Sequence, residues 1–162
     1  MDWECGWLGG MSHNGDIKFK NGKIEIKNNN SAFGKFVVDM NKIDCFDLSG
    51  GAKSKLISHL KSNDFFSVDN YNEAILEIDS LEHIKENKFL LFGDLMIKDI
   101  KNPVAMKGQI FKVENGYRAS IKLSFDRAKF NVKYKSKSFF SDLGDNIIDD
   151  NVILNANVQL FK

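Results

Sequence analysis

The sequence of 162 residues has one proline, two cysteines and no long uninterrupted apolar segment. Scarce proline, a hydrophobic fraction of 43% and 14 Phe argue against a disordered or proline-rich protein. No run approaches the ~20 apolar residues that a membrane-spanning helix requires. The N-terminus has no basic segment followed by an apolar run, so we do not expect a secretory signal in this sequence. The chain is predicted to be soluble and compact.

Neither positive nor negative charge predominates in the sequence. Lys and Arg number 23 and Asp and Glu number 22, which gives a formal charge of +1 and no global field to attract nucleic acid or anionic membranes. Cys5 and Cys45 fit neither a C-x-x-C pair nor a dense disulfide framework, so we expect free thiols. The length suits one domain covering residues 1–162. Partners are therefore expected to bind through shape and apolar surface.

The strongest local signal is Asn21-Gly22, the pair preferred in a two-residue type I′ hairpin. Alternating runs flank it, and counting outward from the turn places Phe19 opposite Ile24. One face of this hairpin is then apolar and the other charged. The pattern predicts a tight turn at this pair.

A second pair, Asn115-Gly116, separates two further alternating runs. A two-residue loop would place Val113 opposite Arg118. A three-residue loop with the glycine in the left-handed conformation would place Val113 opposite Tyr117. We prefer the three-residue loop.

Helical periodicity occurs only from Ala52 to Lys61, where Leu56, Ile57 and Leu60 gather on one side. The remaining alternating runs amount to about eight strands without βαβ order, which indicates an antiparallel barrel or sandwich. The barrel is slightly favoured. The fold class is thus all-β with one short helix.

A barrel of about eight strands has an interior that is either filled by side chains or just wide enough for one small ligand. The side chains that alternation directs inward carry almost no hydrogen-bonding groups, so a guest along them must be apolar. Gly93, Ala74 and Ala156 reduce bulk among these positions, which favours a tunnel. The predicted lumen residues are Phe19, Phe36, Val38, Met40, Leu76, Ile78, Leu95, Ile97, Ile121, Leu123, Leu154 and Val158.

Several segments, spread over most of the chain, carry a family resemblance. They are Gly9–Gly15, Gly34–Ile43, His59–Phe66 followed by Tyr71 and Ala74, Gly93–Lys98, Lys101–Val104, Asp126–Phe130 and Ser138–Asp145. In this order and at these spacings the sequence resembles the YceI family. The resemblance implies an eight-stranded lipocalin-like barrel with a helix beside it. It also implies a lumen that takes a polyisoprenoid or isoprenoid-quinone type of amphiphile.

The same resemblance implies homodimers and export to the periplasm, although a cytoplasmic location stays open because the sequence shows no signal peptide. A dimer interface is expected on the outer face, where apolar side chains need cover unless the helix and loops supply it. A lipid carrier of this kind would also contact a membrane or redox partner transiently. The outer-face residues are Val37, Ile75, Leu90, Phe92 and Met96.

Four aromatic residues are candidates for the end of the lumen. Phe65 and Phe66 follow the helix, and Phe139 and Phe140 lie before the last strand. They form either a mouth that admits a lipid tail or plugs that seal the barrel. The sequence does not separate these alternatives.

Three polar residues are candidates for contact with a lipid head group. His13 and His59 lie within the resemblance segments, where they act either as hydrogen-bonding posts or as structural histidines. Arg127 can bind a diphosphate or carboxylate through two parallel hydrogen bonds. Alternatively, Arg127 pairs with its neighbour Asp126.

Catalytic and metal-binding signatures are missing. The histidines lack metal-ligand spacing, and no EF-hand order, phosphate loop or G-x-S-x-G elbow occurs. We therefore expect no catalytic residues, metal or cofactor, and a non-enzymatic protein that stores or transports an apolar lipid. The alternatives are a filled barrel that serves as a dimerisation module and, less favoured, a small-molecule enzyme on the same barrel.

Overall fold

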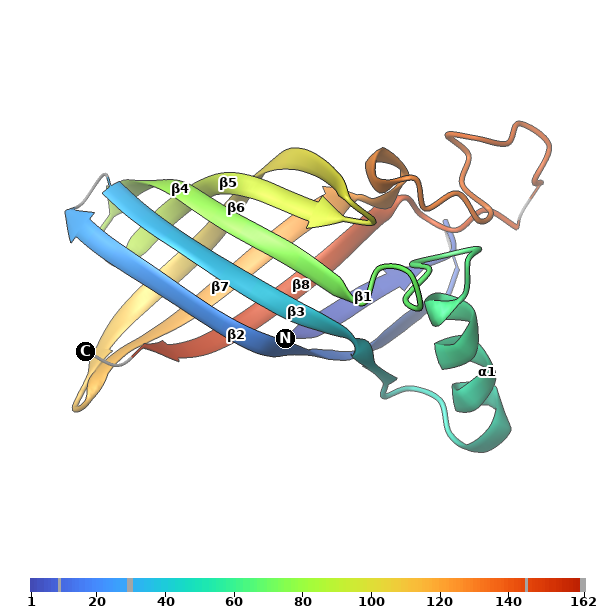
Figure 1. The fold of residues 1–162 in the computed structure, drawn as a ribbon, viewed down its shortest axis with the longest axis horizontal. Helices are drawn as coiled ribbons and strands as arrows, with labels where there is room; N and C mark the ends of the chain where they lie inside the picture. The colour runs from blue at the N-terminus through green and yellow to red at the C-terminus, as the bar shows by residue number, and fades with distance from the viewer. Residues whose placement is uncertain (9, 29–30, 145, 161–162) are drawn as a thin grey trace.

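The computed structural model describes residues 1–8, 10–28, 31–144 and 146–160. They form a closed antiparallel barrel in which each strand pairs with the next along the chain and β8 returns to β1 (Figure 1). The elements are β1 Asp2–Gly6, β2 Ser12–Asn28, β3 Ser31–Cys45, α1 Gly50–Lys61, β4 Glu73–Lys85, β5 Lys88–Ile97, β6 Ile100–Val113, β7 Gly116–Asp126, the 3-10 helix η1 Arg127–Phe130 and β8 Asn151–Leu160. The predicted barrel with one helix is confirmed.

Helix α1 begins at Gly50, slightly before the predicted start, and ends as predicted at Lys61. Ser49 precedes it without a side-chain capping hydrogen bond. Figure 1 shows α1 outside one end of the barrel, the end at which the long β7–β8 connection also lies. Leu60 is buried, and Leu56 and Ile57 pack against the core as the periodicity predicted. None of the helices in the described ranges is long and apolar enough to cross a membrane.

The hairpin predicted at Asn21-Gly22 is wrong, because this pair lies in the middle of the long strand β2. Phe19 pairs with Val38 of β3 rather than with Ile24, and a register shift follows it. A Cβ atom added to the glycine would lie 2.2 Å from Cδ1 of Phe36. The glycine therefore leaves room for an aromatic ring from the neighbouring strand and does not form a turn.

The β6–β7 turn also differs from both predicted registers. Val113 pairs with Gly116, so Glu114-Asn115 is the two-residue loop and Gly116, with a φ of 133°, is the first residue of β7. The β5–β6 turn is equally short and consists of Lys98-Asp99, with φ values of 52° and 57°. Both residues of this turn are left-handed, as in a type I′ turn, although neither is the glycine or asparagine that this conformation favours. Turn composition was therefore a poor guide to the loops of this barrel.

The two barrel ends are closed by different means. At the end away from α1, short turns connect β4 to β5 and β6 to β7. Phe89 and Leu91 of β5 are buried inside the barrel, and a Cβ atom on Gly108 would lie 2.4 Å from Cζ of Phe89. Packed side chains therefore fill the barrel away from α1. The α1 end is built from loops and polar contacts.

Candidate functional site

The lumen contains a cavity of about 140 Å³ with an almost wholly apolar lining. Every predicted lumen residue lines it: Phe19, Phe36, Val38, Met40, Leu76, Ile78, Leu95, Ile97, Ile121, Leu123, Leu154 and Val158. Alternation thus identified which side chains point inward. Their contact with a ligand stays a prediction.

Other lining residues were not singled out from the sequence. Trp3 and Cys5 lie on β1, whose short length gives too few alternating positions to reveal an inward face. Met106 on β6 and Leu60 on α1 also line the cavity. Two sequence signals could have identified them: the alternation of apolar residues in β6 and the apolar side of α1. Strand alternation alone could not show that a helix residue closes the lumen.

The cavity volume limits what the lumen holds in this conformation. About 140 Å³ is close to the size of a buried apolar cavity that binds benzene, and below the ~300–1,000 Å³ of typical ligand pockets. Met40, with its flexible thioether, and Phe66, which is half-buried, border the space. The space in this conformation is therefore smaller than a long alkyl chain.

Gly93 does not act as predicted. It is not one of the cavity-lining residues, whereas Ala74 and Ala156 are. A Cβ atom on Gly93 would lie 2.0 Å from the carbonyl oxygen of Glu77, at a place where the register of β4 and β5 shifts. Its role is to permit close approach of two strands, so the small residue does not widen the lumen.

The aromatic residues predicted at the lumen end separate into two groups. Phe65 and Phe66 line the cavity, and Phe65 is buried, with its ring centroid 5.5 Å from that of Tyr134. Phe139 and Phe140 are 42% and 49% exposed and do not line it. The structure therefore does not bring the four rings together into one mouth. Of the four predicted rings, those of Phe65 and Phe66 border the lumen.

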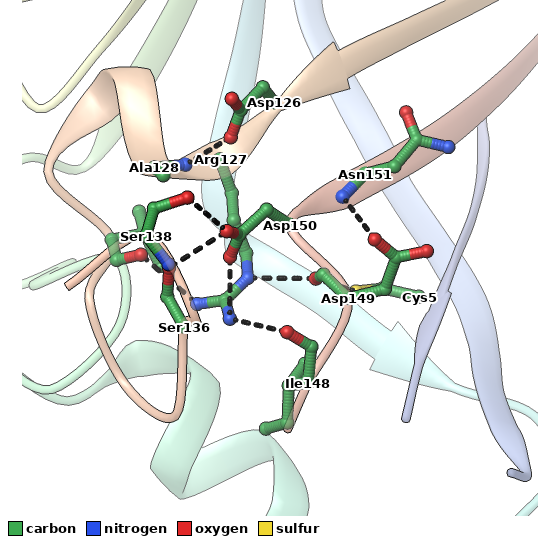
Figure 2. Close-up of polar contacts among 11 residues, drawn as sticks. Cys5, Asp126, Arg127, Ala128, Ser136, Ser138, Ile148, Asp149, Asp150 and Asn151 are labelled. Atoms are coloured by element: carbon green, nitrogen blue, oxygen red, sulfur yellow. Dashed lines mark hydrogen bonds and ion pairs between the residues drawn. The ribbon is translucent and has the colours of Figure 1, made fainter. Parts of the chain in front are cut away.

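Arg127 lies at this end with 1% of its surface exposed, and it lines the cavity. Nε donates to the carbonyl oxygen of Asp149 at 3.0 Å, Nη1 to that of Val132 at 3.0 Å and Nη2 to that of Ile148 at 3.1 Å (Figure 2). Burial lowers the pKa of the guanidinium, and the nearby Asp150 opposes that effect. These three hydrogen bonds therefore tie Arg127 to the segment that connects β7 and β8.

The charged partner of Arg127 is Asp150, at 3.1 Å between Nη2 and Oδ1. The predicted pairing with Asp126 is wrong, because the Asp126 carboxylate caps η1 by accepting the backbone N–H of Ala128 at 2.8 Å. Adjacent residues on this strand end point their side chains apart. The partner comes instead from the residue directly before β8, where the chain returns.

Asp150 is itself buried and shared by two hydroxyl groups. Its Oδ2 accepts from Ser136 Oγ at 2.8 Å and from Ser138 Oγ at 2.7 Å (Figure 2). Its Oδ1 is close to the guanidinium but not aligned for a hydrogen bond, so that contact is mainly ionic. This network fastens the β7–β8 connection over the end of the lumen.

Cys5 borders the same network. Burial is the main cause that raises the pKa of its thiol to about 11, so the group stays protonated at neutral pH. Its Sγ lies 3.5 Å from the carbonyl oxygen of Asp149. Cys5 and Cys45 are free thiols, in agreement with the sequence prediction.

The predicted head-group histidines lie outside the cavity lining. His13 Nδ1 is 2.7 Å from Oδ2 of Asp47, whose Oδ1 accepts the backbone N–H of Asn14 at 3.0 Å. Partial burial raises the pKa of Asp47, but the hydrogen bonds from Asn14, His13 and Cys45 outweigh it and hold that pKa well below its usual value. This cluster fastens the loop after β3 to β2.

His59 projects from α1 against aromatic rings. Its ring centroid is 4.4 Å from that of Tyr134 and 5.1 Å from that of Phe65, both edge-on. Nε2 is 3.8 Å from Oδ2 of Asp64. The histidine therefore packs behind the residue that closes the lumen, where its contacts are structural.

Comparison with known proteins identifies the architecture. Residues 3–160 match the family model described as a YceI-like domain. The chain is 30% identical over 135 residues to a UPF0312 protein of Photorhabdus laumondii, an alignment that spans 80% of this chain and 65% of that protein. BcnA of Burkholderia cenocepacia has a similar fold, with a TM-score of 0.77 and 16% identity over 96% of this chain and 92% of that one. The YCEI protein of Campylobacter jejuni gives a TM-score of 0.64 and 17% identity over 91% and 84% of the two chains. The chain therefore belongs to the YceI-like domain family.

Proposed function

We propose that this protein binds an apolar lipid in the barrel lumen and performs no chemical reaction on it. The observation that carries the proposal is the cavity of about 140 Å³ walled by inward-facing aliphatic and aromatic side chains. Burial of an alkyl chain there contributes about 25 cal/mol per Å² of apolar surface. A polar guest would lose its hydrogen bonds with water and find few replacements.

A polyisoprenoid or isoprenoid-quinone type of amphiphile fits the family resemblance, with storage or transport as the purpose. Such a chain exceeds the present cavity, so its entry requires side-chain movement at the α1 end. Phe66 is half-buried there and borders the cavity. Rotation of this ring would lengthen the space without opening the strand pairs.

Two alternatives are less well supported. A filled barrel that serves only as a dimerisation module should have no apolar cavity of this size. An enzyme needs reactive groups that face its substrate, and among the residues that the structure describes the titratable side chains on the cavity wall are Cys5 and Arg127. The Cys5 thiol is held protonated, and the Arg127 guanidinium is engaged with three carbonyl oxygens.

Self-association and export to the periplasm are further parts of this proposal, together with transient contact with a membrane or redox partner. The dimer prediction was based on apolar residues of the outer face. Of these, Val37 is buried within one chain, and Ile75 and Met96 are half-buried. Val37 pairs with Ile75, and Ile75 with Met96, so the three form a continuous row across β3, β4 and β5. Light scattering at micromolar concentration that gives the mass of a monomer would reject the dimer.

Native mass spectrometry with lipid extraction of the purified protein tests the proposed function. The matched variants are Leu95→Trp, which fills the lumen, and Phe92→Trp, which changes the outer face of the same strand. Leu95→Trp should abolish co-purified lipid and leave the melting temperature nearly unchanged, because the ring occupies ligand space. Phe92→Trp should retain the lipid.

The opposite result identifies a filled core. Overpacking a full interior costs about 1–3 kcal/mol and lowers the melting temperature by several degrees. If Leu95→Trp has this effect and the wild-type protein yields no lipid, lipid binding is wrong. The structural module then replaces it.

A further inference from the structure

A second pocket, separate from the lumen, lies at the α1 end of the barrel. Its volume is about 470 Å³, and polar side chains from three segments line it together with Tyr134, Phe140 and Leu143. The segment after α1 contributes Asn63, the β5–β6 turn contributes Lys98, and the segment after η1 contributes Asn131, Lys133 and Lys135. In contrast to the lumen, this pocket gathers ammonium groups and amides.

The three lysines are not neutralised by neighbouring carboxylates. Within residues 1–8, 10–28, 31–144 and 146–160, none of them forms an ion pair. Asp64 also lines the pocket, and its Oδ2 lies 3.8 Å from Nε2 of His59. Burial lowers the pKa of Lys98, and the charge of Lys133 lowers it further. The pocket therefore brings three ammonium groups together around one space, with Asp64 as the acidic residue of its lining.

The backbone around the pocket is unusual as well. Lys98, Asn131 and Lys135 have φ values of 52°, 58° and 49°, in the left-handed region. Lys98 takes this conformation in the two-residue β5–β6 turn, and Asn131 takes it as the C-cap of η1. Lys98 Nζ donates to the carbonyl oxygens of Phe65 and Asn131, at 3.1 and 3.0 Å.

Phe65 is the partition between the pocket and the lumen. Its side chain lines the lumen, and its carbonyl oxygen accepts the hydrogen bond from Lys98. On the other side its ring packs against Tyr134, which lines the second pocket, at 5.5 Å between centroids. These two rings therefore lie next to each other, one lining each space.

We infer that this pocket holds the anionic head group, of the phosphate or carboxylate class, of the lipid whose tail occupies the lumen. The inference rests on the proposed function and names the chemical class of the ligand's polar end. Lys133 and Lys135 supply charge, and Asn63 and Asn131 supply amide donors. An anion here would pair with these ammonium groups. The head-group role is thereby assigned to lysines in a neighbouring pocket, whereas it was predicted from the sequence for Arg127.

The test compares probes that share a tail and differ in charge: decyl phosphate, decanol and inorganic phosphate. Trp3 lines the lumen, so its fluorescence in a Trp7→Phe background reports occupancy of the lumen. Calorimetry measures inorganic phosphate. The double variant Lys133→Gln/Lys135→Gln removes two charges from the pocket, and Lys137→Gln removes an exposed charge from the same segment outside it.

The wild-type protein should bind decyl phosphate more tightly than decanol. The double variant should weaken decyl phosphate binding about tenfold, leave decanol binding unchanged and keep the wild-type melting temperature. Lys137→Gln should match the wild type with both probes. The preference for decyl phosphate should also shrink as salt is added.

Other outcomes overturn the inference in distinguishable ways. Equal affinities for decyl phosphate and decanol, or an equal loss in both charge variants, would reject the head-group site while leaving lumen binding intact. Lysine-dependent binding of inorganic phosphate without a preference for decyl phosphate would identify a free-anion site instead. If neither decyl probe binds, the lipid-binding function itself is wrong.

Discussion

The lumen wall and the α1 end of the barrel are built on different principles. The wall consists of strands whose apolar side chains alternate, and many residues contribute similarly to one apolar surface. The α1 end depends on single polar contacts, such as the ion pair between Arg127 and Asp150. Substitutions that conserve volume and polarity should therefore be tolerated in the wall but not at the α1 end.

The largest effect is expected from Asp150→Ala. It leaves the buried Arg127 guanidinium without its counter-ion and two serine hydroxyls without their acceptor. The free energy of unfolding should fall by about 3–5 kcal/mol in urea denaturation. Asp142→Ala, at an exposed aspartate of the same connection, is the control and should have little effect. A loss below about 1 kcal/mol for Asp150→Ala would contradict the importance given to this network.

A smaller loss is expected in the lumen wall. Leu123→Ala should lower the free energy of unfolding by about 2–3 kcal/mol, near the lower end for buried leucines, because this side chain already borders a cavity. Leu123→Met, which conserves volume, should cost less than about 1.5 kcal/mol. Thermal and urea unfolding measure both variants. If the two variants cost the same, the wall is as residue-specific as the α1 end.

The same contrast explains what the sequence could predict. Alternation reports the face of a strand, so the inward positions of Val38, Leu95 and Leu123 followed directly. Turn residues are more ambiguous, because a glycine serves either a turn or a close approach. The Asn21-Gly22 pair carried the turn signal, yet its glycine accommodates the Phe36 ring.

Loop-built contacts leave no periodic signal at all. Arg127 and Asp150 are brought together only when β8 returns beside β7. Adjacency in sequence pointed to Asp126 instead, and that carboxylate caps η1. The lysine pocket was missed for the same reason, since Lys98 lies in a turn distant in sequence from Lys133 and Lys135. Tertiary placement, rather than local pattern, defines the α1 end.

A modest and pH-dependent effect is expected at Asp47. Its pKa is lowered in the folded protein, so the stabilisation is present above the unfolded value of about 3.9 and is lost as pH falls through the folded value. Asp47→Asn should therefore lower the free energy of unfolding by about 1 kcal/mol at neutral pH. The difference from the wild type should shrink in acid. Urea unfolding at pH 7 and pH 3 measures it, and an equal deficit at both values would contradict the assignment.

The smallest effect concerns thiol reactivity. Burial keeps the Cys5 thiol protonated, and Cys45 is also buried, so iodoacetamide should label neither residue appreciably in the folded protein at pH 8. Both should react after unfolding in urea, which is the control. Intact-protein mass spectrometry counts the adducts. Labelling of native Cys5 at the rate of a free thiol would show that the lumen end opens readily.

The pairing order of the strands also has a kinetic consequence. Among the described residues, the strand pairings from β2 to β8 join elements that follow one another in the chain, whereas β1 and β8 come from its two ends. Closure of so long a loop carries a large entropic cost, so sequence-distant contacts form slowly. We therefore expect the barrel to assemble as a curled sheet from β2 to β8 and to close last. The joint between β1 and β8 should be the first place to open on unfolding.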